Sequence, residues 1–526
     1  MNTVFSLSGN QIMPVYDACI DADIRIVHVR HEAAAVYMAD AWAQLTGSPG
    51  VALLTAGPGF ANGLSPLYSA RQAESPVVLL SGDSPVAEDG NGAFQEMAQA
   101  DMTRPIVKQA ARVGIVGELP GMLKTAFDIA LSGRRGPVHL ALPFDVLNAD
   151  EPKGEDFSSA GFKPAPQSLS PGVAERIADA VASASRPVIL LGPQHNRSRS
   201  PSRVAALEQA LGAPVVAMES PRGLRDPALG AFAEILASAD LVVGLGKKFD
   251  FTLGFARSAI LAPDADIIVV DPEPDAIEKA RELAGDRILL SDAAAIADAI
   301  DEITALNPDG GSNARHDAWR AEVEEALALR LPLPAAGERI GPQQICETVN
   351  RFLAEAAEPI LICDGGEFGQ WAQAGCSAPV RIINGMSGAI GGGLCYALAA
   401  KLARPGSTVV ALMGDGTAGF HFAEFDTAAR EGADFLAVIG NDDCWNAEHQ
   451  IQLRDYGPDR LIGCALSPDT RYDLAAAAFG GHGEHVTTAA ELEPALLRAA
   501  ASRRPACINV SMAGVAAPTV TRARAG

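Results

Sequence analysis

The sequence predicts an α/β protein made of three Rossmann-like open-sheet domains. Short β-branched and apolar runs alternate with helical stretches along most of the chain, which favours parallel strands joined by helices. At 526 residues the chain is too long for a single hydrophobic core. A segment rich in Pro, Gly and Ser, residues 151–172, separates the first group of strands from the second.

We place three domains and a tail along the chain. The first domain spans residues 1–150, the second 168–310 and the third 340–514, and residues 515–526 form a loose tail because they have no core pattern. Each expected strand is rich in Val, Ile or Leu, as buried parallel strands are. The expected strands are 27–30, 50–59, 75–83 and 136–143, then 187–192, 214–218, 239–246 and 265–271, and finally 359–366, 407–413, 435–439 and 505–513.

Composition excludes several classes of function. The formal net charge of −23 and the pI of about 4.8 argue against binding to nucleic acid or to an anionic membrane. No apolar run approaches the ~20 residues of a membrane span, and no charged-then-apolar signal peptide opens the chain. The eight cysteines include no C-x-x-C pair, so we expect reduced thiols in a cytoplasmic protein.

The most informative motif is Gly414-Asp415-Gly416, followed further along by Asn441-Asp442. It lies between two predicted strands with a helical stretch between them, so the strands should be parallel. If they are neighbours, Asp415 and Asp442 emerge at one carboxyl edge, with the strands about 4.8 Å apart. Two carboxylates there suit Mg²⁺ or Ca²⁺, and the glycines allow the backbone to approach a phosphate.

This unit resembles the diphosphate-binding motif of thiamine-diphosphate (ThDP) enzymes, which reads GDG and then NN or ND. The three successive α/β domains resemble the pyrimidine, middle and diphosphate domains of the ThDP decarboxylase and carboligase family. The resemblance implies ThDP and Mg²⁺ as cofactors, with Asp415, Asp442 and the main-chain carbonyl of Cys444 as metal ligands. The other contacts that it implies around the diphosphate are Gly414, Gly416, Thr417, Gly366, Glu367, Phe368 and Trp445.

Glu32 follows a predicted strand and opens a helical stretch, which matches the family's catalytic glutamate. By resemblance, its carboxylate bonds the pyrimidine ring of ThDP and favours the imino form, which takes the thiazolium C2 proton. The carbanion then attacks a carbonyl group, and the ring acts as electron sink. Pro58 and Asn62 would meet the pyrimidine, the Gly388 carbonyl would accept from its amine, and Ile390 would hold ThDP bent. The structural alternative is a glutamate favoured by the helix dipole.

Substrate contacts are implied for Gln95, in the segment GAFQE, and for Gln11 and Asn384. The segments RHEAAA, AEFDT and RPACINV resemble benzaldehyde lyase. That lyase, however, has a catalytic histidine where this chain has Gln11, and glutamine cannot shuttle a proton at neutral pH. Enzymes that use CoA thioesters carry a C-terminal flap, whereas only a short tail follows Met512.

The leading prediction is a ThDP- and Mg²⁺-dependent carbon–carbon lyase or carboligase, acetolactate-synthase-like, that acts on a small carbonyl substrate. The substrate class is 2-oxo acids or 2-hydroxy ketones. The alternative is a 2-hydroxyacyl-CoA lyase or an oxalyl-CoA-type decarboxylase. A non-catalytic ThDP-fold partner protein is a third possibility, which the presence of Glu32, Asp415 and Asp442 disfavours.

Three further expectations rest on the resemblance. Lys247 and Lys248 lie where relatives hold FAD or ADP in the middle domain, with a solvated charge pair as the alternative. In the family the glutamate and the diphosphate site come from different subunits, so we expect a homodimer or homotetramer with active sites at the interface. The family usually has a helix before the strand at residues 3–7, and its loss would expose apolar surface on the first domain.

Overall fold

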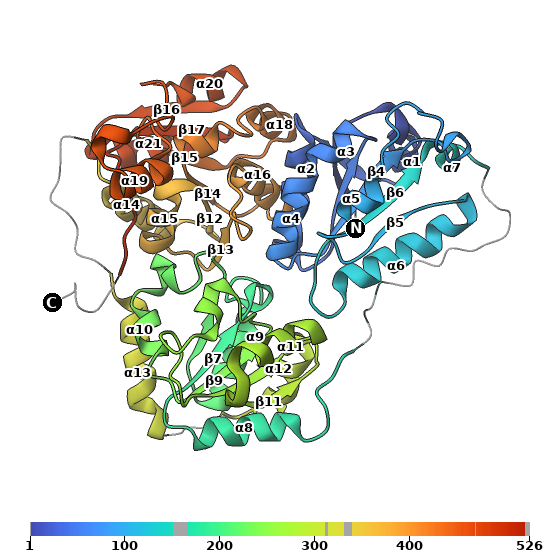
Figure 1. Cartoon of the computed structure of the whole chain (residues 1–526). Helices are drawn as coiled ribbons and strands as arrows, with labels where there is room; N and C mark the ends of the chain where they lie inside the picture. The colour runs from blue at the N-terminus through green and yellow to red at the C-terminus, as the bar shows by residue number, and fades with distance from the viewer. Residues whose placement is uncertain are drawn as a thin grey trace.

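The structure is a computed structural model of the chain, and it describes residues 2–150, 162, 164, 166–310, 314–330, 339–468 and 470–520. It contains three sheets of parallel strands, each flanked by helices (Figure 1). The predicted α/β class with three open-sheet domains is therefore confirmed. Most of the expected connection at 151–172 lies outside the described residues.

The first sheet has six strands in the order β2-β1-β3-β4-β6-β5. They are β1 (Thr3–Ser6), β2 (Arg25–His28), β3 (Gly50–Leu54), β4 (Val77–Asp83), β5 (Ala110–Arg112) and β6 (Val138–Pro143). The helices of this domain are α1 (Met13–Asp21), α2 (Glu32–Thr46), α3 (Pro58–Asn62), α4 (Leu64–Gln72), α5 (Gln99–Thr103), α6 (Leu119–Leu131) and α7 (Phe144–Leu147).

The third sheet repeats this topology, in the order β13-β12-β14-β15-β17-β16. Its strands are β12 (Ile360–Asp364), β13 (Val380–Ile383), β14 (Val409–Gly414), β15 (Leu436–Asn441), β16 (His482–Val486) and β17 (Ala506–Ser511). Its helices are α14 (Pro342–Glu355), α15 (Gly366–Gly375), α16 (Gly393–Ala403), α17 (Asp415–Ala418), α18 (Glu424–Glu431), α19 (Asn446–Asp455), α20 (Tyr472–Ala478) and α21 (Ala489–Ala501). The first and third domains are thus two copies of one arrangement.

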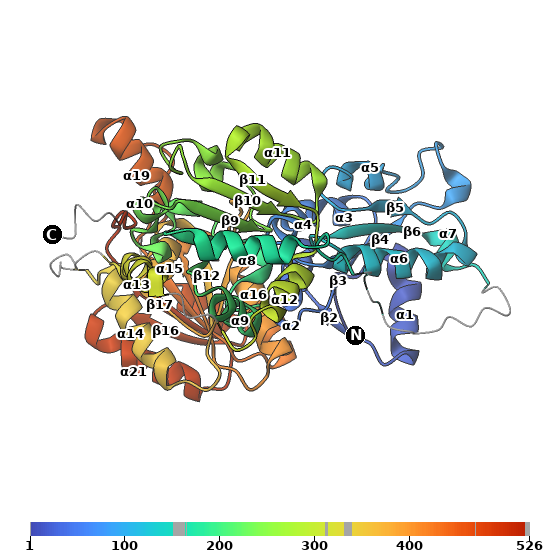
Figure 2. The same cartoon turned by 90° about the horizontal axis from the view of Figure 1, so that it is seen from below.

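The second sheet has five strands in the order β11-β10-β9-β7-β8. They are β7 (Pro187–Leu191), β8 (Val215–Ala217), β9 (Leu241–Leu245), β10 (Asp266–Val270) and β11 (Ile288–Asp292). Helices α8 (Val173–Ser183), α9 (Pro201–Leu211) and α12 (Ile296–Ala305) pack on one face, and α11 (Pro274–Ala284) lies on the other (Figure 2). Helices α10 (Phe232–Leu236) and α13 (Ala314–Ala328) share the core of α11.

Helices α2 and α16 join the first and third domains. The two helices belong to one buried cluster that includes residues of both sheets. At their contact the Tyr37 and Tyr396 rings meet edge to face at 5.9 Å, and the Tyr396 hydroxyl donates to the buried Asp40 carboxylate. Because α2 begins at Glu32 and α16 follows the Gly-rich loop of the third domain, this contact fixes two predicted site elements relative to each other.

Buried ion pairs join the first and second domains. The Arg134 guanidinium pairs with Glu74 of its own domain and with Asp271 at the end of β10.

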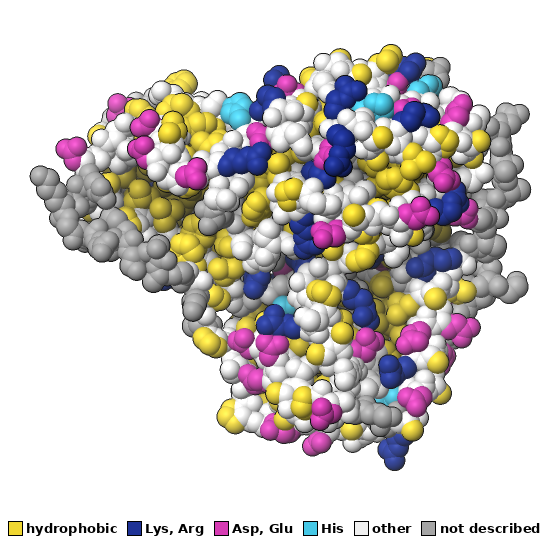
Figure 3. Space-filling model, turned by 180° about the vertical axis from the view of Figure 1, so that it is seen from behind, with side chains coloured by type: hydrophobic (Ala, Val, Ile, Leu, Met, Phe, Trp, Pro, Cys, Tyr) yellow, Lys and Arg dark blue, Asp and Glu magenta, His cyan; other side chains and the backbone are white. Residues whose placement is uncertain are grey.

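The surface carries charges of both signs side by side over the face drawn in Figure 3. Among the described helices, none has the length and apolar character to cross a membrane.

Candidate active site

The GDG motif lies at the carboxyl edge of the third sheet. Strand β14 pairs in parallel with β15, with Gly414 opposite Gly440. Asp415 and Asp442 each follow directly on one of these strand ends. The two strands are neighbours, as the sequence predicts, so both carboxylates emerge at the edge where open α/β sheets bind ligands.

The two carboxylates are held in an environment that disfavours their charge. Asp415 accepts from the backbone N–H of Gly416 at 2.8 Å and of Cys444 at 3.3 Å. Burial nevertheless raises the pKa of Asp415 to about 6. Burial, together with the nearby charge of Asp415, raises the pKa of Asp442 to about 7. A cation between them would favour the ionised form of both groups.

The Asp415 and Asp442 carboxylates suit a hard cation whose coordination is completed by a bound ligand. Among the described residues, no group of three or more His, Cys, Asp and Glu side chains gathers as metal ligands do. Mg²⁺, however, is usually held by one or two carboxylates and completed by water and phosphate oxygens. Asp415 and Asp442 therefore suit Mg²⁺ only if main-chain carbonyls and a phosphate group supply the remaining oxygens.

Other loops of the third domain meet the motif at close range. A methyl group on Gly365, after β12, would lie 2.3 Å from Thr417 Oγ1 and 2.9 Å from Ile390 Cγ2. A methyl group on Gly416 would lie 2.7 Å from the Trp445 ring. The edge thus gathers the predicted residues of loops 365–367, 388–391, 414–417 and 442–445.

Asp364, which sequence reasoning missed, holds the loop that carries Gly388 and Ile390. Its buried carboxylate accepts from Asn384 Nδ2 at 2.7 Å and from the N–H groups of Gly391 at 3.1 Å and Gly393 at 2.6 Å. Burial raises the pKa of Asp364 to about 6. An aspartate at the end of a predicted strand was the available signal. Asn384 therefore serves this loop through its amide, while its Oδ1 is buried without a hydrogen bond from any described residue.

The residues after β12 divide between the edge and the core. Glu367 accepts from Ala517 N–H at 2.9 Å, and Trp371 Nε1 donates to the Val515 carbonyl at 3.2 Å. Phe368, for which we expected a place beside the diphosphate, has its side chain in the core, where a methyl on Gly440 would touch its ring. Residues 515–520 form no helix or strand, but they contact the site through these bonds.

Glu32 is the first residue of α2, and the side chain of His31 caps the helix by accepting from Ala33 N–H at 3.1 Å. The Glu32 carboxylate accepts from Asn62 Nδ2 at 3.0 Å. A methyl group on Gly59 would lie 3.2 Å from its Oε1. The structure therefore brings Glu32 together with the predicted 55–62 loop, in which Pro58 begins α3.

Gln11 and Gln95 lie at the carboxyl edge of the first sheet. Gln11 is buried and accepts from Thr55 Oγ1 at 2.9 Å. Gln95 has the left-handed φ of +61°, and its Oε1 is buried without a hydrogen-bond partner among the described residues. A methyl on Gly57 would lie 2.9 Å from Gln95 Cβ. A neutral amide with an unused acceptor thus borders the same loop as Glu32.

Comparison with known proteins identifies the family. Residues 1–102 match the thiamine pyrophosphate enzyme N-terminal TPP binding domain, 174–300 the central domain and 364–510 the C-terminal TPP binding domain. The chain belongs to the thiamine pyrophosphate enzyme family. Thiamine pyrophosphate and thiamine diphosphate are two names for one cofactor, so the predicted family and cofactor class are confirmed.

Three relatives with assigned names are an acetolactate synthase large subunit and two 2-hydroxyacyl-CoA lyases. The chain is 33% identical over 528 residues to the acetolactate synthase large subunit IlvG of Mycobacterium tuberculosis, covering 97% of this chain and 93% of that protein. It is 30% identical to the 2-hydroxyacyl-CoA lyase 2 of Danio rerio, covering 91% of this chain and 83% of that protein. The Homo sapiens 2-hydroxyacyl-CoA lyase 2 is also 30% identical, with coverages of 91% and 82%.

The second domain of this thiamine enzyme shows a partnered lysine where we considered FAD or ADP. The Lys247 side chain is buried, donates to Thr252 Oγ1 and lies 3.8 Å from Asp250. Burial lowers the pKa of Lys247. Lys248 is half-buried and lines a small cavity together with Lys247. Neither a flavin nor a nucleotide follows from this arrangement.

Proposed function

We propose that this enzyme is a ThDP- and Mg²⁺-dependent carbon–carbon lyase or carboligase that acts on 2-oxo acids or 2-hydroxy ketones. The observation that carries the proposal is the Asp415–Asp442 pair at the carboxyl edge of the third sheet, in a chain that also begins α2 with Glu32. When bound, ThDP supplies a carbanion nucleophile and an electron sink for chemistry at a carbonyl carbon. Cleaving or forming a bond next to a carbonyl is the reaction that such a group supports.

Some of these residues would contact the cofactor and its metal ion, and others would contact the substrate. Asp415, Asp442 and the Cys444 carbonyl would hold Mg²⁺, and Gly416 and Thr417 would bind the diphosphate through backbone N–H groups. Glu32 would hold a proton at a pyrimidine nitrogen of the bound cofactor. Gln95 would accept a hydrogen bond from a substrate hydroxyl group, because its Oε1 has no partner among the described residues.

The active site would form between two copies of the chain. Exposed apolar side chains support this: Phe94 is 76% exposed beside Gln95, and Phe420 is 54% exposed beside Gly391. Large apolar side chains at a candidate site are typical of surfaces that a partner covers. A homodimer or a homotetramer would provide that cover. The eight free cysteines suit a reducing, cytoplasmic compartment.

The alternative is a 2-hydroxyacyl-CoA lyase or an oxalyl-CoA-type decarboxylase, which the likeness to 2-hydroxyacyl-CoA lyase 2 favours. The two candidates differ in whether the substrate carries a CoA thioester. A non-catalytic partner protein is disfavoured because it would have no need for Glu32 or for two buried carboxylates.

A substrate panel tests the proposal. Pyruvate, benzoylformate, benzoin, and formyl-CoA with an aldehyde are each incubated with protein, ThDP and Mg²⁺, and products are identified by chromatography. We expect turnover of a free 2-oxo acid or of benzoin, lost in Glu32→Gln but retained in Glu175→Gln, which alters an exposed first-turn glutamate of α8. Turnover of formyl-CoA alone would replace the proposal with the alternative, and no ThDP-dependent turnover would overturn both.

A further inference from the structure

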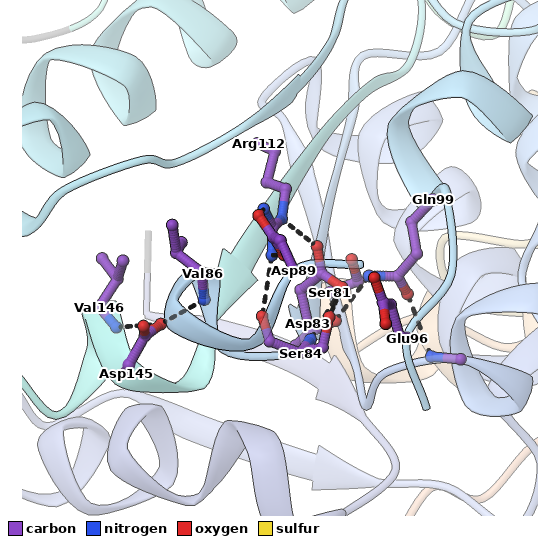
Figure 4. A network of polar contacts seen from close by, with 12 residues as sticks. Ser81, Asp83, Ser84, Val86, Asp89, Glu96, Gln99, Arg112, Asp145 and Val146 are labelled. Atoms are coloured by element: carbon purple, nitrogen blue, oxygen red, sulfur yellow. Dashed lines mark hydrogen bonds and ion pairs between the residues drawn. The ribbon is translucent and has the colours of Figure 1, made fainter. Parts of the chain in front are cut away.

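The loop between β4 and α5, residues 84–98, carries Phe94 and Gln95 and has only one short 3₁₀ turn, Val86–Glu88, of regular structure. Figure 4 shows the polar contacts that surround it. Its conformation is not one that the chain adopts unaided, because a non-glycine residue at φ +61°, here Gln95, is sterically disfavoured. Groups outside the loop must therefore hold it.

Arg112, the last residue of the edge strand β5, contacts Ser84 at the start of this loop and Asp89 near its middle. Its Nε donates to Asp83 Oδ2 at 2.6 Å, at the end of β4. Its Nη1 and Nη2 donate to the two oxygens of Asp89 at 2.7 and 2.9 Å, and Nη2 also donates to the Ser84 carbonyl at 2.9 Å. One guanidinium thus ties the strand end, the first loop residue and the 3₁₀ turn together, a pattern that only the planar fork of arginine supplies.

Further bonds carry this order on to Gln95. The Asp145 carboxylate accepts from Val86 N–H at 3.0 Å and Ala87 N–H at 3.1 Å. The Glu96 carboxylate accepts from the N–H groups of Gly90, Gly92 and Ala93 at 2.7 to 3.0 Å. The Glu96 bonds thus join the residue after Gln95 to residues 90–93, which precede it.

The second anchor lies beneath the loop. Gln99, the first residue of α5, is buried, accepts from Gly57 N–H at 3.2 Å and donates to the Gly82 carbonyl at 2.9 Å. Gly57 packs closely against Gln95, because a methyl on Gly57 would lie 2.9 Å from Gln95 Cβ. Arg112 fixes the outer part of the loop against the strand end, and Gln99 fixes its base to the loop that borders Glu32.

We propose that Arg112 is a positioning residue for the reaction, which through Asp83, Asp89 and Ser84 holds Gln95 with its free amide oxygen toward the substrate. The assignment of Gln95 to substrate rests on the proposed function, whereas the hold of Arg112 on the loop does not. Arg112 itself touches neither substrate nor cofactor in this account. The Arg112 side chain is 29% exposed and lies outside the hydrophobic core, whereas that of Asp83 is only 3% exposed, so the exposed partner Asp89 offers the milder change.

The test combines amide hydrogen exchange with kinetics in the purified full chain loaded with ThDP and Mg²⁺. In Arg112→Gln we expect amides in residues 84–96 to exchange at least about tenfold faster. For the compound of the panel that the wild type turns over, kcat/KM should fall about 10- to 100-fold. The Kd of ThDP should stay within about twofold, because its diphosphate contacts lie in the third domain.

Three variants serve as comparisons. Arg112→Lys should be intermediate, because an ammonium group can meet Asp83 or Asp89 but cannot reproduce the fork. Asp89→Asn should reproduce part of the effect, and its side chain is 47% exposed, so it leaves the fold intact. Arg104→Gln, which breaks the exposed pair with Asp101 on the neighbouring helix α5, should match the wild type in exchange and kinetics.

Two outcomes would overturn the proposal. Unchanged amide exchange of residues 84–96 in both Arg112→Gln and Asp89→Asn would show that the hydrogen bonds of Arg112 do not order the loop. Faster exchange with wild-type kcat/KM would show that the order has no bearing on the reaction. If the wild type turns over none of the panel compounds, the proposed function fails, while exchange still decides whether Arg112 holds the loop.

Discussion

Glu424 illustrates how one buried carboxylate joins the first and third domains. Its Oε1 accepts from Arg30 N–H at 2.9 Å, two residues before Glu32, and its Oε2 accepts from Thr427 Oγ1 at 2.6 Å. Burial raises the pKa of Glu424 to about 6. A carboxyl whose pKa is raised in the folded state contributes stability below its unfolded pKa of about 4.3, and this contribution is lost as the pH rises through about 6.

We expect Glu424→Gln to remove this pH dependence, because glutamine does not titrate, while its Oε1 can still accept from Arg30 N–H and its Nε2 can donate to Thr427 Oγ1. Between about pH 4.5 and pH 7.5, the stability of the wild type relative to the variant should fall by about 2 kcal/mol. Thermal melting of the apo-protein at both pH values measures the difference. Glu175→Gln, at an exposed position, should show no such change. A wild-type-minus-variant difference that is constant with pH would contradict the role given to Glu424.

Gly365 and Gly366 form a matched pair for testing the packing of the cofactor loops. Both have positive φ, of +47° and +66°. A methyl on Gly365 would collide with Thr417 and Ile390, whereas a methyl on Gly366 would meet nothing within 4 Å. We expect Gly366→Ala to cost only about 1 kcal/mol of backbone strain. Gly365→Ala should in addition weaken ThDP binding at least about tenfold, measured by calorimetry. A ThDP affinity of Gly365→Ala equal to that of the wild type would contradict the arrangement.

At the scale of elements, most buried strands were predictable from their own residues, whereas four of the six edge strands were not. Strands β4, β9 and β14 are apolar runs because they are covered on both faces. Four strands without a prediction, β5, β11, β13 and β16, lie at sheet edges, whereas β1, which only the family resemblance placed, lies inside its sheet. The sequence of β16, HGEHV, is largely polar and half-exposed, so no apolar run marks it. An edge strand pairs on one side only and needs less apolar surface.

The site residues also differ in whether the sequence alone predicts them. Asp415, Asp442 and Glu32 were predictable because their positions after strands and before helices are local. Asp364 and Arg112 were not, since each acts through loops that only the tertiary structure brings to it. Nor was the bond of Ala517 to Glu367, because the last residues have no pattern that would predict a contact.

The C-terminal segment gives a prediction at this scale. Residues 514–520 supply the Val515 carbonyl to Trp371, the Ala517 N–H to Glu367 and the Val520 side chain to the core of the second domain. Removing residues 514–526 should therefore lower the melting temperature by several degrees and weaken ThDP binding, because Glu367 loses a donor. Removing only 521–526 is the control, and equal melting temperatures for the two truncated proteins would contradict the assignment.

At the scale of the whole molecule, we propose that two chains together form one active site. Mixing subunits that carry Glu32→Gln with subunits that carry Asp415→Asn tests this directly. Each variant alone should be inactive. If the site draws on two chains, half of the randomly formed dimers are mixed and each has one intact site, so activity should recover to about a quarter of the wild type. No recovery after subunit exchange, with dimers confirmed by light scattering, would place both residues of each site in one chain.

We propose that Asp415 and Asp442 bind ThDP through a shared cation. Calorimetric titration of ThDP into the apo-protein, with Mg²⁺ and with chelator, tests it most directly. We expect tight binding only with Mg²⁺, and a loss of at least about a hundredfold in Asp415→Asn and in Asp442→Asn, because each variant removes one anionic ligand. ThDP binding of the same strength in chelator, or in the two variants, would contradict the account.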